Sequence, residues 1–133
     1  MKNKKYIMKI YTKKAPKPIG PYSQAIKTKN LLMISGQIPI HVNSKKIPKK
    51  IYDQTILVLN NIKEIIKKTD FKIKNIIKTT IFTTNLNKIK IINSAYKKFF
   101  KNKLLIFPAR SCIEVSKLPK NVKIEIEAIV YKK

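Results

Sequence analysis

The chain has 133 residues, which suits one domain with a buried core, and 44% of them are hydrophobic, too many for a disordered protein. Its formal net charge is +25, and its single cysteine excludes an intrachain disulfide, as is usual in a reducing compartment. No apolar run approaches the ~20 residues of a membrane helix, and residues 6–10 are too short and too interrupted by lysine for a signal-peptide core. We therefore expect one domain, residues 1–133, in the cytoplasm.

The first part of the chain is predicted to form strands. Residues 5–12 alternate lysine-rich and apolar positions, which is typical of a strand. The segment APKPIGPYSQA is expected to be a loop, because its prolines and glycine hold the backbone extended or turning. Residues 25–27 and 31–35 are expected to pair as a hairpin around a turn at residues 28–30, and residues 39–48 to form a loop.

From residue 50 the apolar spacing becomes that of a helix. Ile51, Leu59, Ile62 and Ile66 recur at helical intervals, which predicts an amphipathic helix over residues 50–68. The remaining elements are predicted by the same reasoning: a strand over 76–83, a helix over 87–100 with Tyr96 on its apolar stripe, and strands over 110–115 and 122–131.

The order β-β-β-α-β-α-β-β predicts an α+β sheet with both helices on one face. The other face needs cover as well, because strands such as residues 76–83 carry apolar side chains on both sides. Self-association is the simplest way to provide that cover.

Arg110 is the only arginine among the 31 basic residues. Along its strand, Arg110 shares a face with Cys112 and Glu114, and Glu125 shares a face of the last strand with Glu127. If the last two strands pair as a hairpin across residues 116–121, the arginine and the carboxylates face the same cleft. The alternative is a structural Arg–Glu pair with solvated neighbours.

The chain has only two glycines, Gly20 and Gly36, next to Tyr22 and Ser35. A sequence so poor in glycine is expected to keep it where a side chain is costly, either for a positive φ or for close approach to the backbone. Two ordinary tight turns are the alternative.

Other chemistries find little support. Cys112 has no Cys–His signature with His41, the only histidine, and is expected to be a half-buried thiol. The acids, the histidine and the cysteine show no metal-ligand spacing, and no phosphate-binding glycine motif is present. We therefore expect no metal and no cofactor.

The charge of +25 raises the possibility of a nucleic-acid partner. However, the lysines are spread along the whole chain without dense blocks, and arginine, which reads bases and phosphates better, is almost absent. The abundance of Lys, Ile and Asn also matches codons rich in adenine and thymine. We expect a solvated basic surface that binds nucleic acid only non-specifically.

Taken together, the motifs IGPYSQA, LMISGQIP, IIKTTIF, FPARSCIEV and LPKNVKIEIEAIV closely resemble the RidA (YjgF) family of reactive-intermediate deaminases. The resemblance implies a chorismate-mutase-like fold, with a mixed sheet of about six strands and a trimeric barrel-like core with active sites in clefts between subunits. It also implies hydrolysis of 2-enamino and 2-imino acids, such as 2-aminoacrylate, to 2-keto acids and ammonia. This activity protects pyridoxal-phosphate enzymes and needs no cofactor.

The resemblance also suggests roles for individual residues. Arg110 should grip the substrate carboxylate with both guanidinium donors, and Glu125 should position or activate the attacking water. Tyr22 and Ser35 should line the cleft, and the backbone N–H of Cys112 should help to hold the substrate. Glu127 is interpreted as structural.

Two alternatives remain at this point, RNA binding with ribonuclease or translation-inhibitor activity, and metabolite sensing without turnover. The chain also departs from the family where members commonly have glycine, with Asp70 after the first helix and Lys45–Lys46 in the loop before Pro48. Asp70 in a left-handed conformation would cost of order 1 kcal/mol, so we expect a less stable fold than that of a typical member.

Overall fold

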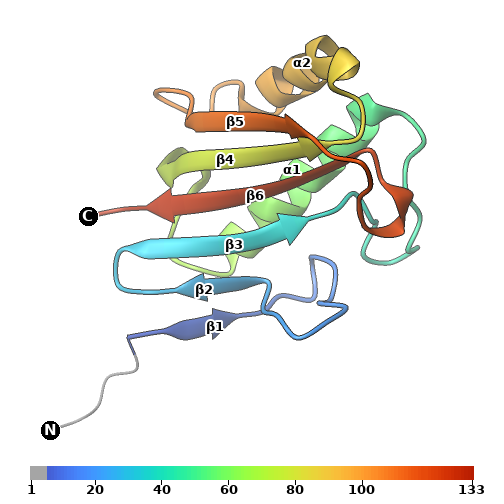
Figure 1. Cartoon of the computed structure of the whole chain (residues 1–133). Helices are drawn as coiled ribbons and strands as arrows, with labels where there is room; N and C mark the ends of the chain where they lie inside the picture. The colour runs from blue at the N-terminus through green and yellow to red at the C-terminus, as the bar shows by residue number, and fades with distance from the viewer. Residues whose placement is uncertain (1–5) are drawn as a thin grey trace, which may run out of the picture.

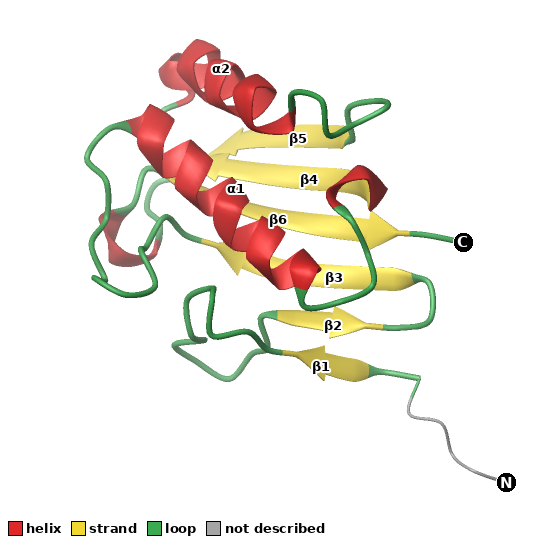
Figure 2. Ribbon diagram, turned by 180° about the vertical axis from the view of Figure 1, so that it is seen from behind, coloured by secondary structure: helices red, strands yellow, loops and turns green. Residues whose placement is uncertain are grey.

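The computed structural model describes residues 6–133. One mixed sheet in the order β1-β2-β3-β6-β4-β5 forms one layer, and two helices cover one of its faces (Figures 1 and 2). The elements are β1 Met8–Ile10, β2 Ala25–Lys27, β3 Leu31–Gln37, α1 Ile51–Lys67, β4 Ile76–Thr83, α2 Ile89–Phe100, β5 Ala109–Glu114 and β6 Ile124–Tyr131. The predicted α+β class, the element order and the single helical face are confirmed.

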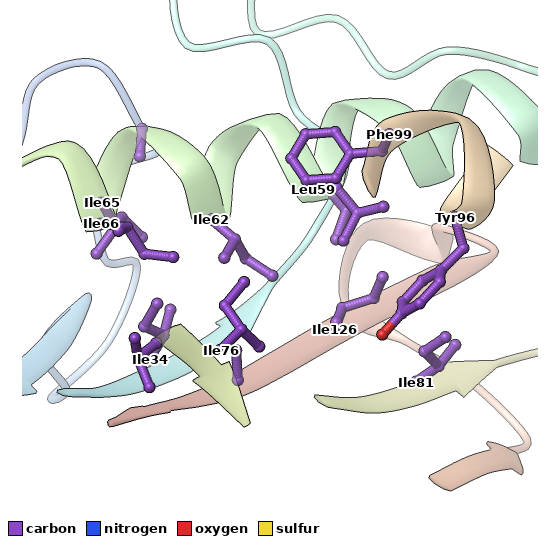
Figure 3. Packing of buried hydrophobic residues seen from close by; sticks show 14 of the residues in the cluster. Ile34, Leu59, Ile62, Ile65, Ile66, Ile76, Ile81, Tyr96, Phe99 and Ile126 are labelled. Atoms are coloured by element: carbon purple, nitrogen blue, oxygen red, sulfur yellow. The ribbon is translucent and has the colours of Figure 1, made fainter. Parts of the chain in front are cut away.

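Both helices form where the apolar side chains recur every three or four residues. In α1, Leu59 and Ile62 are 1% exposed and point at the sheet (Figure 3). In α2, Tyr96 is 5% exposed and also points at the sheet, whereas Phe99, 6% exposed, points toward α1. The side chains that point at the sheet meet the inward side chains of β3, β4 and β6, among them Ile81 at 0% exposed. This core between helices and sheet holds the strands in register.

The opposite face of the sheet is open in the single chain. In β6 the buried residues alternate with Glu125, Glu127 and Tyr131, which point away from the helices. Apolar side chains on this face remain 44–46% exposed, namely Met33, Ile77, Ile113 and Tyr131. The sequence-based expectation that this face needs cover is therefore supported by exposed apolar surface in the isolated chain.

The predicted hairpin between the last two strands is wrong. β5 pairs in parallel with β4 at the edge of the sheet, and β6 pairs antiparallel with both β3 and β4. The reason is that α2 connects β4 to β5, and such a helical crossover returns the chain as a parallel neighbour. β6 then fills the position between β3 and β4, so β4 separates the two strands predicted to pair.

Two local expectations also need correction. Asp70 does not adopt a positive φ, whereas Lys45 does, with φ 63. Asp70 instead pairs with Lys132 at 2.7 Å and Lys27 at 3.5 Å, and the hydrogen bond from Lys132 lowers the pKa of its carboxyl group. The first strand begins at Met8, and Lys5, where we predicted its start, lies outside the described residues. Among residues 6–133, no helix is both long and apolar enough to cross a membrane.

Candidate functional site

Arg110 lies on the edge strand β5, over an aromatic ring. Its register partner is Thr79, whose buried side chain faces the helices, so Arg110 faces the same side. The guanidinium carbon is 5.1 Å from the centroid of the Tyr96 ring. Arg110 is exposed and forms no ion pair among residues 6–133. The sole guanidinium is therefore available to a ligand.

Tyr96 is a rigid support for this guanidinium. Its side chain is 5% exposed, and its hydroxyl group shares a 2.8 Å hydrogen bond with that of Thr79. The ring also packs edge-on against Phe100, with centroids 4.7 Å apart. Sequence analysis assigned Tyr96 only to the core stripe of a helix, and no signal in the sequence indicated that its ring would lie beneath Arg110.

A hollow of about 260 Å³ opens beside this arginine. Its lining consists of Asn93, Tyr96, Lys97, Phe107, Pro108 and Arg110. Two positions along β5, Cys112 packs against the core, and burial raises the pKa of its thiol more than the charge of Arg110 lowers it. The half-buried position predicted for Cys112 is confirmed, and this environment favours the neutral thiol. We call Tyr96, Arg110 and Cys112 the arginine patch.

Glu125 lies on the other face of the sheet. Its register partner is Phe82 in β4, while that of Arg110 is Thr79, and these two β4 residues are three positions apart and point to opposite faces. The cleft that we predicted between Arg110 and the carboxylates is therefore not formed within one chain. The physical reason is the position of β4 between β5 and β6.

The carboxylate of Glu125 is half-buried and has no partner in the described part of the chain. Burial raises the pKa of this carboxyl group, and the charge of Glu127 raises it further. By contrast, Glu64 pairs with Lys67, and Glu114 accepts a hydrogen bond from the backbone of Leu86. Among residues 6–133, Asp53, Glu114 and Glu127 also lack a cation, but these three side chains are exposed. Glu125 is the half-buried carboxylate without a cation, and this combination marks a candidate functional group.

Ser35 connects Glu125 with the segment that holds Tyr22: it precedes Gly36, which lies close to Glu125, and it bonds the residue that follows Tyr22. Ser35 Oγ donates a 2.6 Å hydrogen bond to the carbonyl of Ser23, the residue after Tyr22. Tyr22 is 48% exposed, and its hydroxyl accepts a hydrogen bond from the backbone N–H of Ile19. Gly36, next to Ser35, lies so close to Glu125 that a Cβ atom added to it would be 2.5 Å from Oε1 of that carboxylate. We call Tyr22, Ser35, Gly36 and Glu125 the carboxylate patch.

The described residues include no group of three or more His, Cys, Asp or Glu side chains that could hold a metal ion.

The site residues predicted from the sequence are divided between the two patches of one chain. Arg110 and Cys112 belong to the arginine patch, and Tyr22, Ser35 and Glu125 belong to the carboxylate patch. One patch has an exposed guanidinium, and the other has a half-buried carboxylate.

Comparison with known proteins gives consistent matches. A family model described as Endoribonuclease L-PSP matches residues 12–132. The chain is 64% identical to "RutC family protein BU371" of Buchnera aphidicola, over 93% of this chain and 97% of the relative. It is 42% identical to the 2-iminobutanoate/2-iminopropanoate deaminase of Escherichia coli K12, over 93% and 97% of the two chains. The crystal structure of E. coli TdcF with bound serine superposes with a TM-score of 0.92 at 41% identity, covering 95% of this chain and 99% of that one.

Proposed function

Because this chain belongs to the Endoribonuclease L-PSP family, the RidA (YjgF) family whose motifs it carries, we propose that it hydrolyses 2-imino and 2-enamino acids. The products are 2-keto acids and ammonia. The E. coli relative at 42% identity is named for this reaction, whereas the Buchnera relative at 64% identity has only a family name. The specific activity and the residue roles below are therefore proposals for this chain.

The observation that carries the proposal is the exposed guanidinium of Arg110, which lies over the Tyr96 ring and has no acidic partner within residues 6–133. A small imino acid presents a planar carboxylate, which two parallel N–H donors of a guanidinium hold in both position and direction. Lysine, which the chain uses at every other basic position, would hold the charge without setting that direction. The serine bound in the TdcF structure is likewise a small molecule with a carboxylate.

Glu125 is proposed to act as the general base. A raised pKa brings the carboxyl group closer to neutral pH, where a base transfers protons more effectively. Glu125 would take a proton from water as its oxygen attacks the imine carbon. Glu125 would pass that proton to the imine nitrogen, which gives a tetrahedral carbon bearing a hydroxyl and an amino group. Transfer of the hydroxyl proton through Glu125 to the amino nitrogen would then let the C–N bond break, so that ammonia leaves and the keto group forms. The imine is already electrophilic, so orientation and one carboxylate are sufficient.

We further propose that the cleft is completed between subunits of a homotrimer. Arg110 and the backbone N–H of Cys112 would come from one subunit, and Tyr22, Ser35 and Glu125 from its neighbour. Two features support this: Arg110 and Glu125 lie on opposite faces of the sheet, and the face bearing Glu125 has exposed apolar side chains. Packing that face against other copies would bury those side chains.

The test is release of ammonia or keto acid from freshly generated 2-aminoacrylate. Arg110→Ala should lose at least about 100-fold in kcat/KM, since a hydrogen-bonded charge pair contributes roughly 1.5–3 kcal/mol and orients the reacting atom as well. The side chain is exposed, so the variant should keep its fold and its oligomeric state. Activity of Arg110→Ala within a few fold of wild type would exclude the proposed role.

RNA binding or cleavage is the second candidate, favoured by the charge of +25 and by the description of the family model. Electrostatic binding without specificity weakens steeply as salt rises. Binding that persists near physiological salt with a sequence preference would favour this candidate over the deaminase. A third reading, metabolite sensing, requires ligand binding without turnover in the same assay.

A further inference from the structure

Gly36 lies where any side chain would collide with Glu125. A Cβ atom built on Gly36 would be 2.5 Å from Oε1 of Glu125, 2.9 Å from its Cδ and 3.1 Å from its Cγ. Relaxed contacts of this kind lie at about 3.5–4.0 Å. The absence of a side chain at Gly36 therefore leaves the space that the Glu125 side chain occupies.

Backbone conformation does not explain this glycine. Neither Gly36 nor Gly20 has a positive φ. At Gly20 a Cβ would meet only the Tyr22 ring, at 3.5 Å, which is an ordinary contact. The sequence left two reasons for a glycine open, a positive φ or the close approach of another group to the backbone. The second reason applies to Gly36, which the Glu125 side chain approaches, and not to Gly20.

The backbone around Gly36 is bulged. Ile34 pairs with Ala128 and Gln37 with Ile126, so Ser35 and Gly36 together lie opposite the single residue Glu127. Such a bulge bends a strand and changes the direction of nearby side chains. Ser35 is fixed at the bulge by its 2.6 Å bond to the carbonyl of Ser23. The bulge thus presents bare backbone to the side chain of Glu125.

We propose that Gly36 is a positioning residue, which lets the Glu125 carboxylate rest against the bulged backbone of β3 in its reactive position. This inference depends on the proposed deaminase activity, in which Glu125 is the base. The further claim is that the space left by the absent side chain of Gly36 decides where the Glu125 carboxylate lies. No hydrogen bond or ion pair holds this carboxylate within residues 6–133.

Gly36→Ala should move the carboxylate rather than the fold. The atoms that the new Cβ meets belong to one flexible, half-buried side chain, which can swing outward. Restoring ordinary contact requires a shift of about 1 Å, and misplacement on that scale can cost up to about 100-fold in rate. We expect kcat to fall about 10- to 100-fold, with KM within about twofold, because Arg110 and its patch are untouched.

A titration of the carboxyl groups gives a readout independent of activity. The chain has only six Asp and Glu residues, so the signal of Glu125 can be followed by carboxyl carbon NMR. Partial burial now raises the pKa of Glu125, and in Gly36→Ala the more solvated carboxylate should have a lower pKa than in wild type. An unchanged pKa would overturn the proposal.

Two further variants separate positioning from a structural role. Glu125→Ala removes all three atoms that the new Cβ would meet, so adding Gly36→Ala to it should not lower its residual activity further. A structural defect would lower that residual activity again. Gly20→Ala is the matched control, with no collision, and should stay within about twofold of wild type in kcat.

The outcomes are distinguishable from those of the proposed function. If wild type does not hydrolyse imines, the deaminase proposal fails, and the carboxyl titration alone decides whether Gly36 sets the position of Glu125. If wild type is active and Gly36→Ala keeps its kcat within about twofold, the positioning proposal is wrong while the deaminase proposal stands.

Discussion

If the cleft is completed between subunits of a trimer, as proposed, two inactive variants should complement each other, because Arg110 and Glu125 lie on opposite faces of the sheet in each chain. Arg110→Ala damages only the arginine patch, and Glu125→Gln damages only the carboxylate patch. In a mixed trimer, a cleft is intact when its arginine patch comes from a Glu125→Gln subunit and its carboxylate patch from an Arg110→Ala subunit. Each homogeneous variant has no intact cleft.

The expected recovery follows from this geometry. With equal amounts and random assembly, each of the two conditions holds with a probability of about one half, so about one quarter of the clefts are intact. The mixture should therefore show about a quarter of the wild-type rate of keto-acid release. The two variants should be combined by co-expression, or by unfolding and refolding together, because subunits of a formed trimer exchange slowly if their interface is large.

A matched control uses two variants of the same patch. Glu125→Gln mixed with Gly36→Ala should show no activity beyond the sum of the two, since every cleft then receives a damaged carboxylate patch. If the mixture of Arg110→Ala and Glu125→Gln stays as inactive as its parts while forming mixed trimers, the two groups do not act in a shared cleft and the reasoning is refuted.

The remaining predictions concern single positions. Tyr96→Phe should destabilise the fold by about 1–3 kcal/mol in a chemical unfolding experiment, because it leaves the buried Thr79 hydroxyl without its partner. Its kcat/KM should stay within about twofold, since the ring beneath Arg110 remains, and a tenfold loss would contradict this account. Glu125→Gln should stabilise the fold at neutral pH: a carboxyl group whose pKa is raised by folding opposes folding when ionised. That gain should vanish below about pH 4.3, where the group is protonated in both states, and a gain that persists there would refute the electrostatic cause. Lys45→Gly should raise stability by about 1 kcal/mol, because Lys45 is exposed with φ 63, and no rise in the melting temperature would contradict this.

The sequence predicts the elements of this fold well because each has a clear period. The helix predicted over residues 50–68 is α1, Ile51–Lys67, and the strand predicted over residues 76–83 is β4, Ile76–Thr83. Strand order was harder, because alternation along β5 and β6 does not specify their neighbours. Placing β4 between them depends on the crossover through α2, which is a property of the whole sheet.

In the candidate site as well, local sequence patterns predict single residues but not the contacts between distant elements. Motifs identified Arg110 and Glu125, and alternation correctly grouped Arg110 with Cys112. The residues next to these two groups are not predictable from sequence. The pattern places Tyr96 only in the core and does not show that its ring lies beneath Arg110. The close approach of Gly36 to Glu125 depends on a bulge between β3 and β6. Both depend on contacts between elements distant in the chain, which no local pattern records.

The separation of Arg110 from Glu125 also has an energetic consequence. If Arg110 and Glu125 lay within reach of each other in one chain, they would form an ion pair. The guanidinium would then be unavailable to a substrate carboxylate, and the carboxylate of Glu125 would be a weaker base. Here the intervening strand keeps them on different faces. Within residues 6–133, the guanidinium therefore lies over Tyr96 without an acidic partner, and the carboxylate lies near Gly36 without a cation. Among the described residues no lysine pairs with Glu125, although the chain has a charge of +25. Lys123, two residues away, donates a hydrogen bond to the carbonyl of Lys49 instead. If a neighbouring subunit brings the two patches together, their charges meet across a substrate whose own carboxylate binds Arg110, which leaves Glu125 free to accept a proton from water.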